Sequence, residues 1–123
     1  VVQPMVLRRG KEGVPDRLVV YSLGNFISNM SREHTDGGVM VKVVLGRKGL
    51  RRYIASAQYL LIYSSRYKNE QGKEDIRVVP AASWSGKNQN SSFSVDSALI
   101  KYVNNTRLFL KGNNKEVEEY IFE

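Results

Sequence analysis

Cysteine is absent from the sequence, which excludes disulfide bonds and metal sites built on thiolates. Histidine occurs once, at His34, and a catalytic divalent metal generally needs about three or more converging ligands. We therefore expect His34 to be an incidental surface side chain. Long apolar runs are also missing, because no stretch approaches the ~20 residues that a membrane-spanning helix requires. We expect no helix of these 123 residues to cross a bilayer.

The charge is strongly basic but unevenly distributed along the chain. The formal net charge is +7, from 19 lysines and arginines against 12 acids. Basic residues occur mostly in pairs at expected turns, as in Arg8-Arg9, Arg47-Lys48 and Arg51-Arg52. This pattern leaves two interpretations open: solvated hairpin ends, or a face that binds an anion. Nucleic acid is not the expected partner, because basic patches that bind it are usually denser and interleaved with aromatic residues.

Apolar runs separated by clusters of glycine, proline and polar residues predict a set of antiparallel strands. The expected strands are residues 1–9, 18–23, 39–45, 50–63 and 76–81. Turns are expected at 10–17 and 46–49, and polar loops at 26–38, 64–75 and 82–92. The run at 18–23 is nearly continuous in apolar residues, which predicts burial on both of its faces.

The pattern changes to helical spacing after residue 94. The residues that recur at this spacing are Val95, Ala98, Leu99, Tyr102, Val103, Phe109 and Leu110. Ser94 suits the N-cap position, and Gly112 lies just past the expected end of the helix. A second, short acidic helix is expected at 113–123. The predicted fold is therefore α+β, mainly antiparallel strands followed by one or two C-terminal helices, in a single unit over residues 1–123.

Gly24, Asn25 and Phe26 form the most suggestive local motif. Glycine at the end of a strand permits positive φ and close backbone approach, and Asn25 offers a carboxamide to a metal, a phosphate oxygen or a backbone group. Phe26 is expected to lock this corner by burying its ring. A structural corner, in which Asn25 satisfies loop amides, and a binding site both remain open. Trp84, in a polar loop, is a candidate for an exposed contact.

Three motifs taken together resemble the C-terminal portion of the bacterial CapA family, the capsule or poly-γ-glutamate synthesis proteins. They are VVQPM at residues 1–5, LVVYSLGNFIS at 18–28 and TDGGVMVKV at 35–43, in the order and spacing of the family. Beyond residue 50 the resemblance is general, limited to strands and a closing helix. The chain begins with Val rather than Met and directly in an apolar run, so we expect a parent protein that extends upstream.

This resemblance implies a fold and the location of an active site. The family is similar to calcineurin-like metallophosphoesterases, so the chain is expected to be the C-terminal half of a four-layer sandwich. The metal ligands of such a domain would lie upstream, the last in a Gly-His-x-Pro-His motif before Val1. The resemblance thus implies no catalytic residue, metal ligand or cofactor in this chain, and a divalent metal in the complete protein. Gln3 and Asn25 are the implied substrate-binding residues, from their positions in the matching motifs.

The resemblance also implies partners and a location. The partners are the upstream part of the same chain, an anionic polymer such as poly-γ-glutamate, and other membrane proteins of capsule synthesis. The location is the cell envelope, at the extracytoplasmic face of the membrane, and a basic surface suits an anionic polymer there. Two other hypotheses remain: a stand-alone basic module that binds an anionic polymer, and a structural domain whose exposed strand edges are covered by the missing half.

Overall fold

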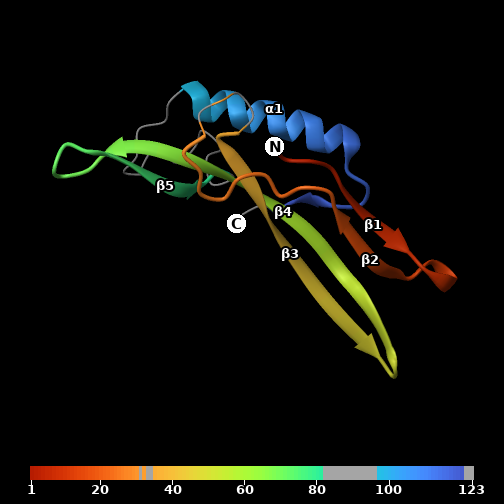
Figure 1. Cartoon of the computed structure of the whole chain (residues 1–123). Helices are drawn as coiled ribbons and strands as arrows, with labels where there is room; N and C mark the ends of the chain where they lie inside the picture. The colour runs from red at the N-terminus through yellow and green to blue at the C-terminus, as the bar shows by residue number, and fades with distance from the viewer. Residues whose placement is uncertain (31, 33–34, 82–96, 121–123) are drawn as a thin grey trace.

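The computed structural model describes residues 1–30, 32, 35–81 and 97–120, and Figure 1 shows their arrangement. Two largely antiparallel sheets and one long helix make up this part of the chain, so the predicted α+β class is confirmed. The elements are β1 (Met5–Arg9), η1 (Lys11–Gly13), β2 (Pro15–Val20), β3 (Gly37–Lys48), β4 (Arg51–Lys68), β5 (Glu74–Pro80), α1 (Ser97–Asn113) and β6 (Glu118–Glu119). The first sheet contains β1 and β2, and the second contains the other four strands.

β1 and β2 form an antiparallel hairpin with Leu7 opposite Leu18. The short 3-10 segment η1 connects them, and it ends at Gly13 with a positive φ of 73°. The expected burial of the second strand on both faces is wrong. None of the six residues of β2 is fully buried, and Tyr21, which follows the strand, is exposed. The physical reason is that β2 belongs to a two-stranded sheet, in which Leu18 and Val20 pack against the core but are only partly buried.

β3 and β4 form the longest hairpin, and Figure 1 shows its tip extending beyond the rest of the molecule. Pairing continues as far as the two-residue turn Gly49-Leu50, so the turn expected at 46–49 is misplaced. Gly46 lies within β3 instead, where the ring of its cross-strand partner Tyr53 fills the space that a side chain would need. Of the two turn residues only Gly49 has a positive φ, 63°, as in a type II′ turn.

The stretch 64–75 was expected to be a polar loop, but β4 and β5 extend into it from either side. Cross-strand polar pairs explain the extension. Arg66 donates to Glu74 at 2.7 Å, and the Tyr67 hydroxyl donates to Asp75 at 3.2 Å. Such pairs stabilise a sheet without apolar residues, so both strands continue through this polar stretch.

α1 lies along one side of the sheets in Figure 1 and packs against β4. Its buried residues recur at helical spacing and are Leu99, Tyr102, Val103 and Leu110. The expected N-cap, Ser94, falls outside the described residues, whereas Gly112 lies inside the last turn rather than past it. In the part of the chain that the structure describes, no helix has both the length and the apolarity of a membrane span.

One apolar cluster joins the two sheets to the helix. Its largest fully buried side chains are Met5 from β1, Leu61 from β4 and Leu110 from α1. Because each comes from a different element, the loss of any one of them loosens contacts among all three elements.

The residues after α1 do not form the second helix expected at 113–123, as far as the structure describes them. Asn114 Oδ1 accepts a hydrogen bond from Met5 N at 2.8 Å, and Lys115 N donates to Met5 O at 3.0 Å. Glu116 then has a φ of 58°, which an α-helix does not accommodate. β6 follows and pairs in parallel with β4. The prediction of a second helix is wrong because backbone pairing with two separate strands outweighs local helix propensity.

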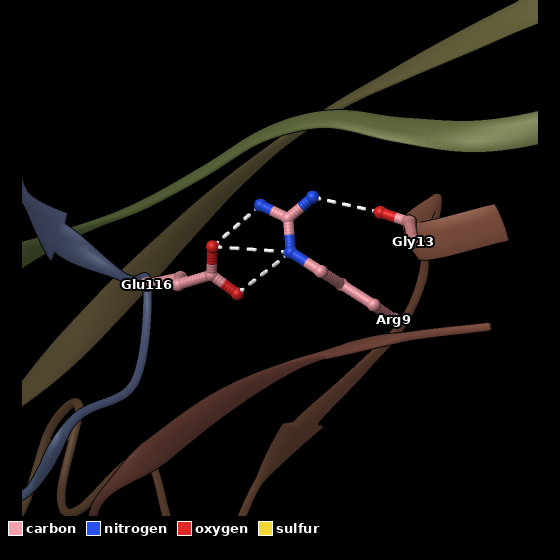
Figure 2. Close-up of polar contacts among 3 residues, drawn as sticks. All are labelled: Arg9, Gly13 and Glu116. Atoms are coloured by element: carbon pink, nitrogen blue, oxygen red, sulfur yellow. Dashed lines mark hydrogen bonds and ion pairs between the residues drawn. The ribbon is translucent and has the colours of Figure 1, made fainter.

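Arg9 connects the first hairpin to the joining segment, a name used here for residues 114–119. Figure 2 shows its guanidinium between the Glu116 carboxylate and the Gly13 carbonyl oxygen. Arg9 Nε donates to Glu116 Oε2 at 3.1 Å, and Nη1 donates to Gly13 O at 2.8 Å. The hydrogen bond from Arg9 lowers the pKa of Glu116, and the same bond raises the pKa of Arg9. The contact therefore links the turn of the first hairpin electrostatically to the joining segment.

We expect Glu116→Gln to lower stability at neutral pH by a small and salt-sensitive amount, because the ion pair is exposed. A carboxyl whose pKa is lower in the folded state stabilises the fold above its unfolded pKa, and this contribution is lost as pH falls through the folded pKa. The stability difference between wild type and variant should therefore shrink as pH falls below the ordinary pKa of 4.5 and vanish once pH is below the lowered pKa of the folded state. Urea unfolding at neutral and acidic pH measures it. Glu70→Gln, in the β4–β5 turn, is the control, and an unchanged difference in acid would contradict the ion pair.

Candidate functional site

Three segments that are far apart in the sequence meet at one corner of the molecule. They are residues 1–4, 22–25 and 37–39. Val2 forms an antiparallel bridge with Leu23, and Gly24 forms another with Gly38. Val39 N donates to Leu23 O at 2.8 Å, which places the segment around residue 24 along the outer edge of β3. The corner thus consists of three backbone segments that pair side by side, with residues 22–25 between the other two.

The close approach of these segments depends on three glycines, which we name the glycine corner. They are Gly24, Gly37 and Gly38. Gly24 has a φ of 74°, in the region that favours glycine. A Cβ on Gly38 would lie 2.7 Å from Leu23 O, and one on Gly37 would lie 2.5 Å from Tyr102 Cζ. Both distances are shorter than real Cβ contacts, so side chains at these positions would force the segments apart.

Tyr102 reaches this corner from α1, and its hydroxyl donates to Gly38 O at 2.8 Å. Burial raises the pKa of Tyr102 above its ordinary value. The hydrogen bond with Thr106 opposes this increase, and the nearby charge of Asp36 adds to it. Tyr102 consequently remains protonated at neutral pH and serves as a fixed hydrogen-bond donor that holds α1 to the glycine corner.

Asn25 lies immediately after the first glycine, and its side-chain amide donates to Thr35 O at 2.8 Å. The backbone N of Asn25 donates to Gly37 O at 3.1 Å. Both bonds hold the two ends of the intervening loop together. The expected burial of the Phe26 ring is wrong, because this residue is exposed. Backbone and amide hydrogen bonds, rather than an aromatic anchor, therefore fix the corner.

A hollow of about 330 Å³ lies between the first residues of the chain and α1, which are neighbours in Figure 1. Its lining residues are Val1, Val2, Gln3, Tyr102, Asn105, Thr106 and Phe109. The polar groups among them are amides and hydroxyls, with apolar surface between. No carboxylate, imidazole or amine side chain belongs to this described lining, and its amides and hydroxyls suit hydrogen bonding to a small polar group.

The two implied substrate-binding residues lie on neighbouring segments outside the strands, and their side chains are used differently. The backbone N of Gln3 donates to Ser22 O at 3.0 Å, close to Asn25 in the sequence. Gln3 lines the hollow, whereas the Asn25 amide is used by the loop. Asn105 and Thr106 also line the hollow and were not singled out from the sequence. The sequence signal for them is a pair of adjacent polar residues in the middle of an amphipathic helix.

A metal centre cannot be assembled from the described residues alone. In residues 1–30, 32, 35–81 and 97–120, no three His, Asp or Glu side chains come together as a metal-sized group. His34 and Trp84, the other residues considered from the sequence, lie outside the described residues. No chemical step is therefore assigned to a metal among the described residues.

Apolar side chains are unusually exposed beside the glycine corner. This corner patch consists of Tyr21, Leu23, Phe26, Ile27 and Met30, all between 49% and 66% exposed. Five large apolar residues within ten positions are more than the scattered exposure that is normal for a protein surface. The patch therefore has the character of a surface that packs against another body.

The chain matches no protein-family model, no curated protein and no solved structure.

Proposed function

We propose that this chain is the C-terminal segment of a CapA-like protein that acts in capsule or poly-γ-glutamate synthesis in the bacterial cell envelope. One observation carries the proposal. The three motifs of the resemblance, at residues 1–5, 18–28 and 35–43, are joined by backbone bridges at the glycine corner. Motifs that resemble one family in order and spacing, and that also build one common structural feature, support a shared origin more strongly than each motif alone.

The corner patch supports a second part of the proposal, a four-layer metallophosphoesterase-like sandwich. In such an arrangement an upstream part of the same protein packs over the exposed apolar residues and carries the Asp, Asn, Glu and His ligands of the metal. Gln3, which lines the hollow, and Asn25, which fixes the adjoining loop, are the proposed residues nearest the substrate. This chain then acts as scaffold and is inactive by itself.

The partners and location follow from the same proposal. The protein works at the extracytoplasmic face of the membrane, together with other membrane proteins of capsule synthesis and with an anionic polymer. A net charge of +7 supports contact with a polyanion.

The coding DNA upstream of Val1 provides the decisive test. We expect a Gly-His-x-Pro-His motif immediately upstream, with Asp- and Asn-bearing motifs before it. The purified chain should also show no phosphodiesterase activity with added Mn²⁺ or Zn²⁺, because it lacks the ligand set. A start codon or an unrelated domain directly upstream, or robust metal-dependent turnover by this chain alone, would contradict the proposal.

A stand-alone basic module that binds an anionic polymer is the second candidate. The observation that favours it is a stretch without acids: residues 39–69 contain seven lysines and arginines and no Asp or Glu. The stretch coincides with β3 and β4, so these charges lie on one hairpin. Salt-sensitive binding of the chain to polyglutamate, together with an unrelated upstream sequence, would favour this candidate over the first.

A further inference from the structure

The tip of the β3–β4 hairpin exposes leucine where turns usually carry polar residues. Leu50, the second turn residue, is 95% exposed, and Leu45 near the end of β3 is 75% exposed. In Figure 1 this tip projects away from α1. Leucines in such positions contribute nothing to the core, and water is an unfavourable environment for them. A partner that accepts apolar side chains would remove this cost.

Cations surround these leucines. Arg47 and Lys48 precede the turn, and Arg51 and Arg52 follow it. Among the described residues, only Arg51 of these four has a carboxylate partner, Glu12. The tip therefore combines exposed leucines with three cations that have no ion pair in the described chain.

Two acids of the β1–β2 hairpin lie close to the tip. Glu12 pairs with Arg51, and Asp16 shares the lining of a hollow of about 270 Å³ with Leu45 and Arg52. Asp16 is itself engaged by Arg17, whose Nε lies 3.1 Å from the carboxylate. The acids near the tip, Glu12 and Asp16, thus already have cationic partners of their own.

We propose that this hairpin tip, residues 45–52, docks on the surface of an anionic lipid bilayer. Leu45 and Leu50 enter the interfacial layer, and the surrounding cations contact lipid phosphates. Peripheral membrane contacts combine these two features, an apolar insertion and basic residues that are attracted to anionic headgroups. A polyanion in water uses the cations but leaves the leucines exposed, so the coincidence of both features favours lipid. The inference stands on this geometry and does not depend on the proposed function.

Flotation of the whole chain with lipid vesicles tests the proposal. At low ionic strength we expect binding to vesicles of phosphatidylcholine mixed with phosphatidylglycerol, and little binding to phosphatidylcholine alone. Added salt should weaken the binding, because part of the attraction is electrostatic. A parallel titration with polyglutamate in solution provides a polyanion without an apolar phase.

Two pairs of variants separate insertion from charge. Leu50→Ser should lower the vesicle partition coefficient about tenfold, whereas Leu108→Ser, also at an exposed leucine (77%) but on α1, should leave it unchanged. Arg52→Gln should lower it about fivefold, whereas Lys68→Gln, at the opposite end of β4, should have little effect. All four side chains are exposed, so the variants should keep the wild-type fold, which circular dichroism checks.

Polyglutamate distinguishes the alternative. We expect Leu50→Ser to leave polyglutamate binding unchanged while it reduces vesicle binding. The proposal is overturned if the chain ignores anionic vesicles at low ionic strength, or if Leu50→Ser binds them as well as wild type. An equal loss of vesicle and polyglutamate binding in Leu50→Ser would also overturn it, because insertion into lipid would then explain nothing.

Discussion

Gly37→Ala should be among the most damaging single substitutions in this chain. The new Cβ would lie 2.5 Å from Tyr102 Cζ and would also collide with the backbone oxygen of Ile62. Because one obstacle is backbone and the other is a buried ring, neither can move without breaking contacts. Overpacking, together with loss of the hydrogen bond from Tyr102 to Gly38, should lower the free energy of unfolding by about 3 to 5 kcal/mol. Urea unfolding followed by circular dichroism measures the loss.

Two other glycines provide controls for this prediction. Gly112→Ala, where no atom lies within 4 Å of the added Cβ, should be neutral or stabilising by up to about 1 kcal/mol. Gly72→Ala, also in open space but at a φ of 74°, isolates the cost of the positive φ, about 1 to 2 kcal/mol. A Gly37→Ala protein as stable as Gly72→Ala would show that α1 does not approach the glycine corner as closely as described.

Leu110→Ala should produce the second large effect. Leu110 is completely buried, at the end of α1 that faces the joining segment. Removal of its side chain loses apolar burial and leaves a cavity, which together cost about 2 to 5 kcal/mol. The free energy of unfolding, measured in urea, should fall by this amount, and amide exchange should quicken in the joining segment.

Leu108→Ala is the matched control, because Leu108 lies two positions away on the same helix and is 77% exposed. The change from leucine to alanine there should alter stability by no more than about 0.5 kcal/mol. Similar effects at Leu108 and Leu110 would mean that the buried face of α1 is wrongly assigned.

The sequence predicted the α+β class and most strands because apolar periodicity and turn residues report local structure directly. It failed where distant residues decide the outcome. Gly46 belongs to a glycine-rich group that is typical of a turn, yet the ring of Tyr53 across the sheet requires a glycine within the strand. Residues 113–123 have helical propensity, yet Asn114 and Lys115 bond to β1, more than one hundred positions earlier. Sequence periodicity contains no information on such partners.

Less of the candidate site than of the fold could be predicted from the sequence. Asn25 belongs to a recognisable sequence motif, but the partner of its side-chain amide, Thr35 O, is visible only in the fold. Asn105 and Thr106 approach Gln3 only because α1 lies across the first residues of the chain. The exposure of the corner patch was also unexpected, since an apolar sequence predicts burial when the surface that would cover it is not considered.

The joining segment has a consequence for how the protein acquires its structure. Met5 and Asn114 are separated by 109 positions, and the segment closes both sheets, at β1 and at β4. During synthesis the first hairpin therefore emerges long before the joining segment that pairs with it. Until then the edge of β1 that pairs with the joining segment lacks its hydrogen-bond partners. Contacts between residues so far apart in the sequence form late, because closing a long loop costs entropy before the contact stabilises it. The joining segment, although near the C-terminal end of the described chain, thus supplies the last contacts that complete both sheets.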